Sequence, residues 1–110
     1  IARLNSDGTL DTTFTATLDF QGQAVAVQPD GKTIVGGFFT ATNGQATGSL
    51  VRLNPNGTTD TTFAANSSFP STVNRIALQP NGRIVVGGSF TFSGITRGLI
   101  RLLPDGGVDT

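Results

Sequence analysis

The 110-residue sequence contains no cysteine, histidine, tryptophan, tyrosine or methionine, and each of its seven acidic residues is an aspartate. These absences exclude a thiolate nucleophile, an imidazole base, a Cys/His zinc site and a disulfide framework. The formal net charge is zero, which predicts no basic patch for nucleic acid, and no apolar run approaches the roughly 20 residues that span a bilayer. We therefore expect a protein that is not an enzyme, has no cofactor, binds no nucleic acid and inserts in no membrane.

Two blocks of sequence recur along the chain. Residues 1–14 (IARLNSDGTLDTTF) align with residues 50–63 (LVRLNPNGTTDTTF) at an offset of 49, and a third copy begins at Leu99. Residues 26–40 align with residues 77–91 at an offset of 51. A period near 50 residues indicates a repeat architecture. The length varies only in the connectors, as is typical of surface loops; these connectors are 15–23, 41–49, 64–72 and 92–98.

Each block predicts a β-hairpin. Pro29, Asp30 and Gly31 lie between short β-branched runs, and this turn chemistry suits a three-residue loop in which glycine takes a positive φ. Such a loop pairs Val25 with Val35 across the hairpin. In the other block the same geometry pairs Leu4 with Leu10. We expect strands at about 24–28, 33–40, 50–54, 58–63, 75–79, 83–91 and 98–103, and a last strand that is incomplete.

The expected fold class is all-β. Four antiparallel strands per repeat of about 49 residues form a meander, and consecutive meanders with apolar residues on both faces build β-propeller blades. Residues 1–23 would be the end of one blade with its connector, 24–72 a full blade with its connector, and 73–110 most of the next blade. Because closed propellers have about 4–8 blades, we expect a fragment of a longer array. The alternative is a ring of several copies.

Charged, glycine and phenylalanine residues recur with the repeat. The hairpin register places an arginine opposite an aspartate in all three copies of the first block, which favours a contact required by the scaffold over a site for an anionic ligand. Glycine doublets end the second strand of each repeat and predict close packing or a bulge. The expected structural residues are Arg3, Asp11, Arg52, Asp60, Arg101, Asp109, Gly36, Gly37, Gly87, Gly88, Phe14 and Phe63.

Two sets of residues are candidates for ligand contact. Asn5, Asp7 and Asp11 alternate like the first oxygen ligands of a calcium loop, although turn chemistry is the favoured interpretation because the third copy has Leu103 at the asparagine position and no glutamate follows. The second set lies in or beside the variable connectors. It comprises Asp19, Phe20, Asn43, Gln45, Phe92 and Arg97.

The repeats resemble the delta-60 repeat family, and the glycine doublet is also similar to kelch repeats. The resemblance covers nearly the whole chain except the connectors, with mild departures at Asn56, Asn81 and Arg83. It implies a β-propeller within large bacterial secreted or surface proteins and gives no catalytic residues. The matching positions are Arg3, Leu4, Asn5, Asp7, Gly8, Asp11, Phe14, Gln28, Asp30, Gly31, Lys32, Val35, Gly36, Gly37 and Phe39.

These observations lead to one main functional hypothesis. We expect a non-catalytic structural and interaction module at the bacterial cell surface, whose connectors, held on rigid blades, bind a protein or a glycan in adhesion. Its other partners would be neighbouring blades of the parent chain or other copies. One alternative is a carbohydrate-binding propeller. Another is a building block of an extracellular filament joined through exposed strand edges.

Overall fold

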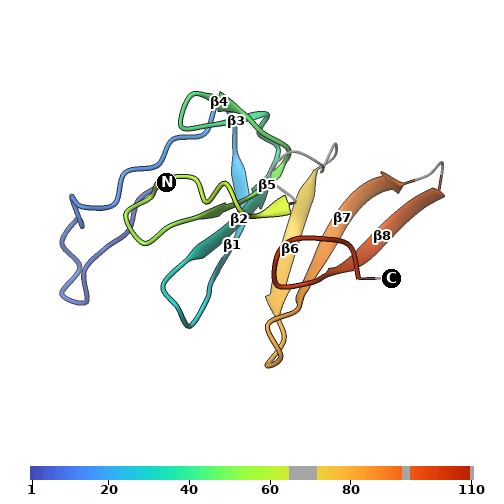
Figure 1. Cartoon of the computed structure of the whole chain (residues 1–110). Helices are drawn as coiled ribbons and strands as arrows, with labels where there is room; N and C mark the ends of the chain where they lie inside the picture. The colour runs from blue at the N-terminus through green and yellow to red at the C-terminus, as the bar shows by residue number, and fades with distance from the viewer. Residues whose placement is uncertain (65–71, 93–94, 110) are drawn as a thin grey trace.

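A computed structural model describes residues 1–64, 72–92 and 95–109, and for residues 90–92 and 95–97 it describes the backbone alone. The protein is all-β with antiparallel pairing throughout these residues, as the sequence predicts (Figure 1). No helix in this part of the chain is long and apolar enough to cross a membrane. The strands are β1 (Gly22–Val27), β2 (Thr33–Gly37), β3 (Ala41–Thr42), β4 (Gln45–Ala46), β5 (Leu50–Leu53), β6 (Val73–Leu78), β7 (Ile84–Phe92) and β8 (Ile95–Leu102).

Two three-stranded sheets share one design. The first sheet has the order β1-β2-β5 and the second has the order β6-β7-β8. Val25 pairs with Val35 in the first sheet, which confirms the predicted register. In both sheets the register shifts near the glycine doublet, between Gly22 and Ala24 in one and between Val73 and Arg75 in the other. The doublets therefore accompany a bulge, as expected.

The predicted fourth strand is much shorter than expected. Residues 58–63 contribute one isolated bridge, between Leu53 and Thr59, instead of a continuous strand. The chain bends directly afterwards, because the Asp60 carboxylate accepts the backbone N–H of Thr62 at 3.0 Å and the Asp60 carbonyl accepts that of Phe63 at 3.2 Å. This turn ends the pairing that the alternating pattern predicts.

Two connectors hold strand residues where loops are predicted. Within 41–49, strands β3 and β4 form a small hairpin whose turn residues Asn43 and Gly44 have φ values of 52° and 78°. Two consecutive positive φ values are typical of a type I′ turn, which Asn-Gly favours. The connector 92–98 is also wrong as a loop, because β7 and β8 continue their pairing into it from Phe90 to Ile95. In the second repeat β7 continues beyond the doublet, whereas in the first repeat β2 ends at Gly37 and a separate hairpin follows.

The core has two layers, one on each face of the first sheet. Ile34 and Val35 are adjacent in β2 and both have no exposed surface, because successive side chains of a strand point to opposite faces. Ile34 belongs to the cluster shared with the second sheet, whereas Val35 packs with Phe14 from the N-terminal segment. The expectation of apolar cover on both faces is confirmed for this sheet.

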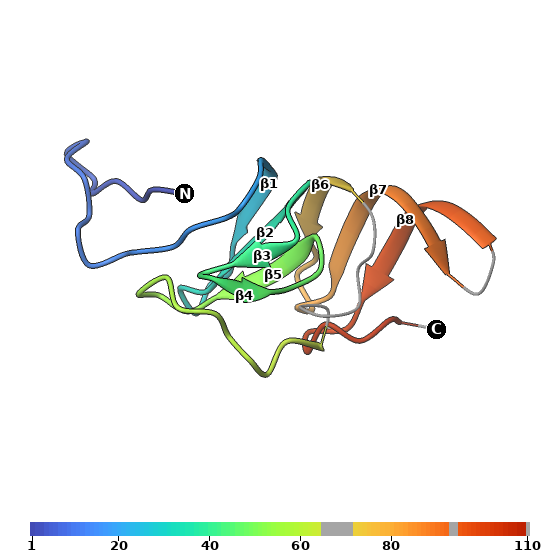
Figure 2. The same cartoon turned by 90° about the horizontal axis from the view of Figure 1, so that it is seen from above.

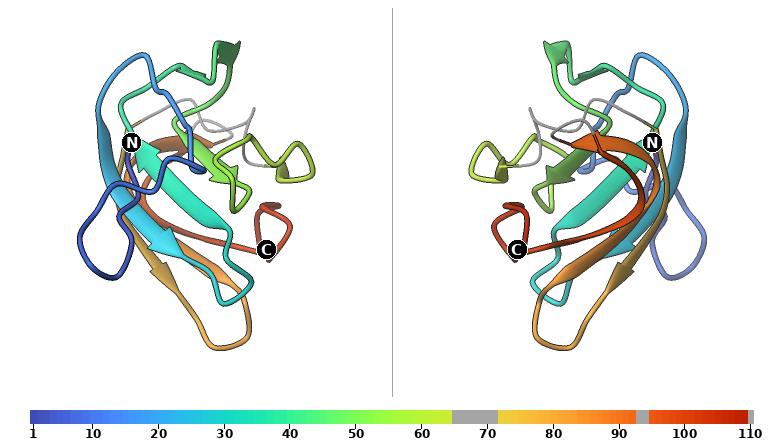
Figure 3. Two further views of the ribbon diagram at one scale, coloured as in Figure 1. Left: turned by 90° about the vertical axis from the view of Figure 1, so that its left-hand side faces the viewer. Right: turned by 90° about the vertical axis from the view of Figure 1, so that its right-hand side faces the viewer.

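The parts lie in a row that follows the sequence. Seen from above, the N-terminal hairpin 1–14 is at one end, the first sheet is in the middle and the second sheet is at the other end (Figure 2). Viewed along this row, the two sheets lie one behind the other (Figure 3). Strands β1 and β2 both contact β6. The first sheet thus covers one face of the second sheet.

Candidate functional site

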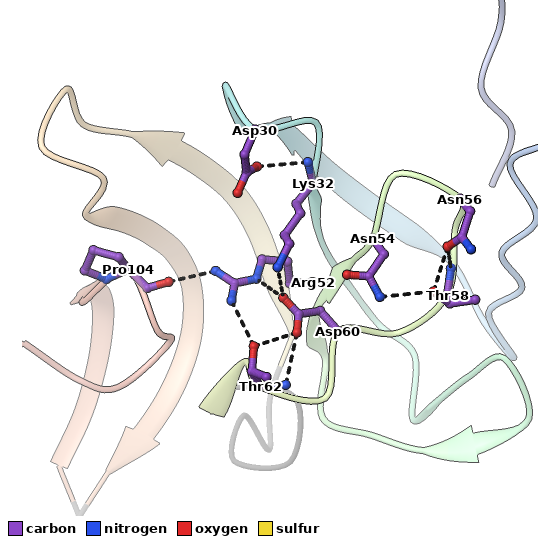
Figure 4. A network of polar contacts seen from close by, with 9 residues as sticks. All are labelled: Asp30, Lys32, Arg52, Asn54, Asn56, Thr58, Asp60, Thr62 and Pro104. Carbon is purple, nitrogen blue, oxygen red and sulfur yellow. Dashed lines mark hydrogen bonds and ion pairs between the residues drawn. The ribbon is translucent and has the colours of Figure 1, made fainter.

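The most buried charged side chains in the described chain belong to a cluster of three charges around Asp60 (Figure 4). Arg52 Nε and Lys32 Nζ each lie 2.8 Å from Asp60 Oδ2. The Asp60 side chain is 5% exposed and that of Arg52 is 11% exposed. Strand β5 supplies the arginine, the turn after it supplies the aspartate, and the β1–β2 turn supplies the lysine. Both carboxylate oxygens of Asp60 are used, since Oδ1 accepts hydrogen bonds from Thr62.

Arg52 also joins the two sheets. Its Nη1 donates to the carbonyl oxygen of Pro104 at 2.8 Å, and its guanidinium carbon lies 4.7 Å from the centroid of the Phe63 ring. A guanidinium over an aromatic face is stabilised by a cation–π interaction. The predicted Arg–Asp contact is thus part of a larger structural cluster that reaches the next sheet.

Electrostatics keep Asp60 charged. Burial acts to raise the pKa of Asp60, but hydrogen bonds from Lys32, Thr62 and Arg52 outweigh it and hold the pKa well below the usual range of an aspartate. A carboxylate held in this state accepts hydrogen bonds and takes no proton near neutral pH. The cluster therefore does not supply a general acid.

The two other copies of the pair form the same contact closer to solvent. Arg3 Nη2 lies 2.8 Å from Asp11 Oδ2, and the arginine stacks 4.7 Å from the Phe14 ring centroid. Arg101 Nε lies 2.7 Å from Asp109. The arginine side chains are 38% and 52% exposed in these copies. The predicted cross-strand pair forms in all three places, and the burial decreases toward both ends of the row.

The proposed calcium ligands are engaged in turns. Asp7 Oδ1 accepts hydrogen bonds from the N–H and hydroxyl of Thr9, and the Thr9 hydroxyl accepts from the Asn5 amide. The hydroxyl of Thr9 lowers the pKa of Asp7, and the hydroxyl of Thr13 followed by Arg3 lowers that of Asp11. In the part of the chain that the structure describes, no three acidic side chains come together as metal ligands would. This geometry is that of an Asx turn.

Asp19 joins two neighbouring connectors. The Asp19 carboxylate accepts hydrogen bonds from the N–H groups of Thr40 and Ala41 at 2.8 and 2.9 Å, and from the Thr40 hydroxyl at 2.6 Å. The Thr40 hydroxyl and both N–H groups lower the pKa of Asp19, against a smaller effect of burial. Asp19 therefore fixes the connector 15–23 against the beginning of the connector 41–49.

Asn43 makes a second junction at the tip of the β3–β4 hairpin. Its side-chain oxygen accepts the N–H of Thr17 at 2.9 Å, and its amide donates to the carbonyl of Gly57 at 3.0 Å and to Thr59 at 3.2 Å. Three separate loops therefore meet at one asparagine. Sequence analysis proposed Asp19 and Asn43 as ligand contacts, whereas in the structure their polar atoms bind the protein itself.

The remaining connector candidates are distributed differently. Gln45 is exposed in β4, where it pairs with Thr42. Phe20 is 63% exposed and lines a cavity with Ile1 and Val25, at the N-terminal end of the row. Phe92 and Arg97 are placed in β7 and β8 by their backbone, and their side chains lie outside the described residues. Of the four candidates whose side chains are described, Asp19 and Asn43 thus bind the protein itself, whereas Phe20 and Gln45 are exposed.

The glycine doublets have a packing role in the first sheet. A Cβ atom on Gly36 would lie 2.2 Å from Val73 Cγ1, and one on Gly37 would lie 2.3 Å from the Gln21 carbonyl oxygen. Such distances are too short for any side chain. Glycine at position 36 therefore lets β6 approach the sheet closely, and glycine at position 37 makes room for the backbone of Gln21. Gly87, the equivalent of Gly36, has its nearest neighbour at 3.6 Å.

Sequence reasoning missed the third charge of each cluster. Lys32 joins Asp60, and Arg83 lies 2.9 Å from Asp109 in the second repeat. The signal was present, because residue 32 aligns with residue 83 in the repeated block and both are basic. The stacking of Arg52 on Phe63 was also detectable, since arginine and phenylalanine recur at the same spacing as Arg3 and Phe14.

Together, the successive sheets and the repeated charge cluster define a β-propeller repeat protein. The chain belongs to the family described as "Domain of unknown function (DUF5122) beta-propeller", whose model matches residues 1–14, 28–63 and 79–110. Comparisons with curated proteins and with solved structures gave no match. The family model leaves out residues 15–27 and 64–78, which contain two of the four predicted connectors.

Proposed function

We propose that the chain is a non-catalytic structural and interaction module of an extracellular bacterial protein. In this proposal the family's repeats are of the delta-60 and kelch-like type, and four-stranded meanders with a period of about 49 residues stand as consecutive blades. The connectors beyond the glycine doublets form the contact surface for a protein ligand on a cell surface. The observation that carries the proposal is the pair of junctions at Asp19 and Asn43, which turn separate connectors into one ordered surface.

The aspartates support the non-catalytic part of the proposal. They are the only acidic residues in the chain, and each of them accepts a hydrogen bond or ion pair within the protein. Six of them accept the N–H two residues further on or in a neighbouring loop, so they serve turns and loop junctions. A general acid or base needs a carboxylate that is available to a substrate. The use of these carboxylates in turns and loop junctions therefore supports a non-catalytic role.

The connector surface can be tested by binding assays with matched variants. Arrays of purified extracellular proteins and of glycans would be probed with the wild-type chain and with the double variant Phe20→Ala/Gln45→Ala, which removes two exposed side chains that belong to neither buried core. Pro29→Ala, in the β1–β2 turn at the opposite end of the strands, is the control (Figure 1). Protein binding that is lost only in the double variant supports the proposal. Binding restricted to glycans would favour a carbohydrate-binding propeller instead.

A further inference from the structure

The contact between the two sheets has a defined set of residues. On the side of the first sheet it uses Ile34, Leu50 and Arg52, and Gly36 gives room to Val73. On the side of the second sheet it uses Ile84, Val86, Ile100 and Leu102, with Ile76 and Leu78 packed against them. Phe63, from the end of the first repeat, completes this core.

The far side of the second sheet presents the same kind of surface, and its described residues are more exposed than their equivalents in the first sheet. We call it the tail face, and define it as Val85, Gly87, Leu99 and Arg101, which align with Ile34, Gly36, Leu50 and Arg52. Leu50 has no exposed surface, whereas Leu99 is 66% exposed. Likewise the Arg52 side chain is 11% exposed and that of Arg101 is 52% exposed. The tail face thus exposes a leucine and an arginine whose equivalents in the first sheet are covered by the second sheet.

The other end of the row has the complementary surface. We call it the head face, and define it as Val25, Val27 and Val35, which align with Ile76, Leu78 and Val86. Val25 and Val27 are 57% and 66% exposed, while their equivalents pack against the shared core. Beside them is a cavity of about 430 Å³ whose lining includes Ile1, Phe20 and Gly22. It lies where the first sheet would meet a preceding sheet.

We propose that copies of this chain associate head to tail, with the tail face of one copy packed on the head face of the next. The contact between the two sheets within one chain is the template, since each face repeats one half of it. In the associated state Leu99 would be covered as Leu50 is, and Arg101 would donate to the carbonyl of Pro55 in the next copy as Arg52 does to Pro104. The inference does not depend on the ligand of the connectors.

Residues 1–11 of the N-terminal hairpin must leave their position on the head face in this association. Residues 99–110 repeat residues 1–12, so the tail of one copy and the hairpin of the next compete for one position on the head face. The hairpin packs loosely on the head face, since Leu4 and Leu10, which pair with each other across it, are 62% and 59% exposed. Residues 99–102 belong to a complete sheet instead. Phe14 stays in place as the equivalent of Phe63.

A mixing experiment tests the direction of the contact. Val27→Asp places a charge on the head face and Leu99→Asp on the tail face, and both positions are exposed enough for the single chain to keep its fold. Light scattering at about 1 mM is expected to give a wild-type mass that is a multiple of 11.3 kDa. Each variant alone is expected at the mass of one chain. Mixed in equal amounts, they are expected to form a dimer, because one intact head and one intact tail remain. Phe38→Asp, at an exposed site outside both faces, is the control and should associate like the wild type.

Other outcomes would overturn the proposal. The proposal fails if wild-type chains remain monomeric at about 1 mM, or if they show no β signal in circular dichroism. Association of the Val27→Asp variant by itself would show a contact that does not use the head face. A mixture of the two variants that stays at the mass of one chain would show that the faces are not complementary.

A disulfide gives an independent check of the register. The chain has no cysteine, so Gly22→Cys and Gly87→Cys variants carry one each. These positions align with Val73 and Gly36, and a Cβ on Gly36 would lie 2.8 Å from Val73 Cβ. The two positions therefore face each other, and a small separation of the strands gives the roughly 3.5–4.5 Å that a disulfide spans. Oxidation of the mixture is expected to give a disulfide-linked dimer of the two variants. Equal yields from each variant alone would contradict the proposed register.

Discussion

Arg52 and Pro104 are joined by a hydrogen bond of 2.8 Å across the contact between the two sheets. The same guanidinium holds Asp60 at 2.8 Å through its Nε atom, so one side chain connects a turn of its own repeat with a turn of the next. A second connection lies nearby, where the N–H of Ala64 donates to the carbonyl of Asp105 at 2.8 Å. The equivalent of that bond runs from Thr15 to Asn56 at 3.1 Å. Contacts between successive repeats therefore recur with the sequence.

Asp60→Asn is expected to destabilise the protein by about 3 kcal/mol, the lower end of the range for a broken buried ion pair, because Lys32 is partly exposed. The change leaves Arg52 and Lys32 near each other without a carboxylate. Asp109→Asn is the matched control, since its arginine partners are more exposed, and it is expected to cost under about 1 kcal/mol. Urea unfolding of the three proteins measures both values. Equal losses in the two variants would show that burial at Asp60 does not set the cost.

The pH dependence of stability provides a separate test of the same cluster. Because the pKa of Asp60 is lowered in the folded state, its contribution is fully present above the unfolded value of about 3.9 and is lost as the pH falls below it. The difference in unfolding free energy between wild type and Asp60→Asn is thus expected to be constant from pH 7 to about 5 and to shrink below about pH 4. Denaturant unfolding in this range measures it. A difference that grows on acidification would mean that the pKa is raised.

Local patterns predicted much of this fold, because turn chemistry and strand alternation act over a few residues. The Pro29-Asp30-Gly31 turn gave the register of β1 with β2, and the repeated arginine and aspartate gave the ion pairs. Contacts between distant segments were not accessible in this way. The bond from Arg52 to Pro104 depends on how two sheets pack. The roles of Asp19 and Asn43 depend on loops that meet only in three dimensions.

Gly36→Ala is expected to be strongly destabilising, because the new methyl group would lie 2.2 Å from Val73 Cγ1 and 2.8 Å from its Cβ. Overpacking of this kind costs about 1–3 kcal/mol. Gly87→Ala introduces the same methyl group at the equivalent position, where the nearest atom is 3.6 Å away, and is expected to leave the stability of the single chain nearly unchanged. Thermal unfolding at low protein concentration compares the two. A similar loss in both variants would place the penalty in backbone conformation instead of in the contact with β6.

Asn43 has two separable functions, which a pair of substitutions can distinguish. Its φ of 52° favours asparagine or glycine, and its side chain joins Thr17, Gly57 and Thr59. Asn43→Gly keeps the turn conformation and removes the side-chain hydrogen bonds. Asn43→Ala removes the same hydrogen bonds and also disfavours the positive φ of the turn. Each lost hydrogen bond costs about 0.5–1.5 kcal/mol, so both variants are expected to be destabilised, and the alanine variant more so.

Amide hydrogen exchange locates this effect in the chain. The N–H of Thr17 donates to the Asn43 side chain and that of Asn43 to the Thr17 carbonyl, so exchange at Thr17 is expected to accelerate in both variants. Exchange at Val35, in the centre of the first sheet, should be nearly unchanged. If Thr17 kept its protection in both variants, Asn43 would not join the connectors, and the ordered surface on which the interaction module depends would have to be maintained by Asp19 alone.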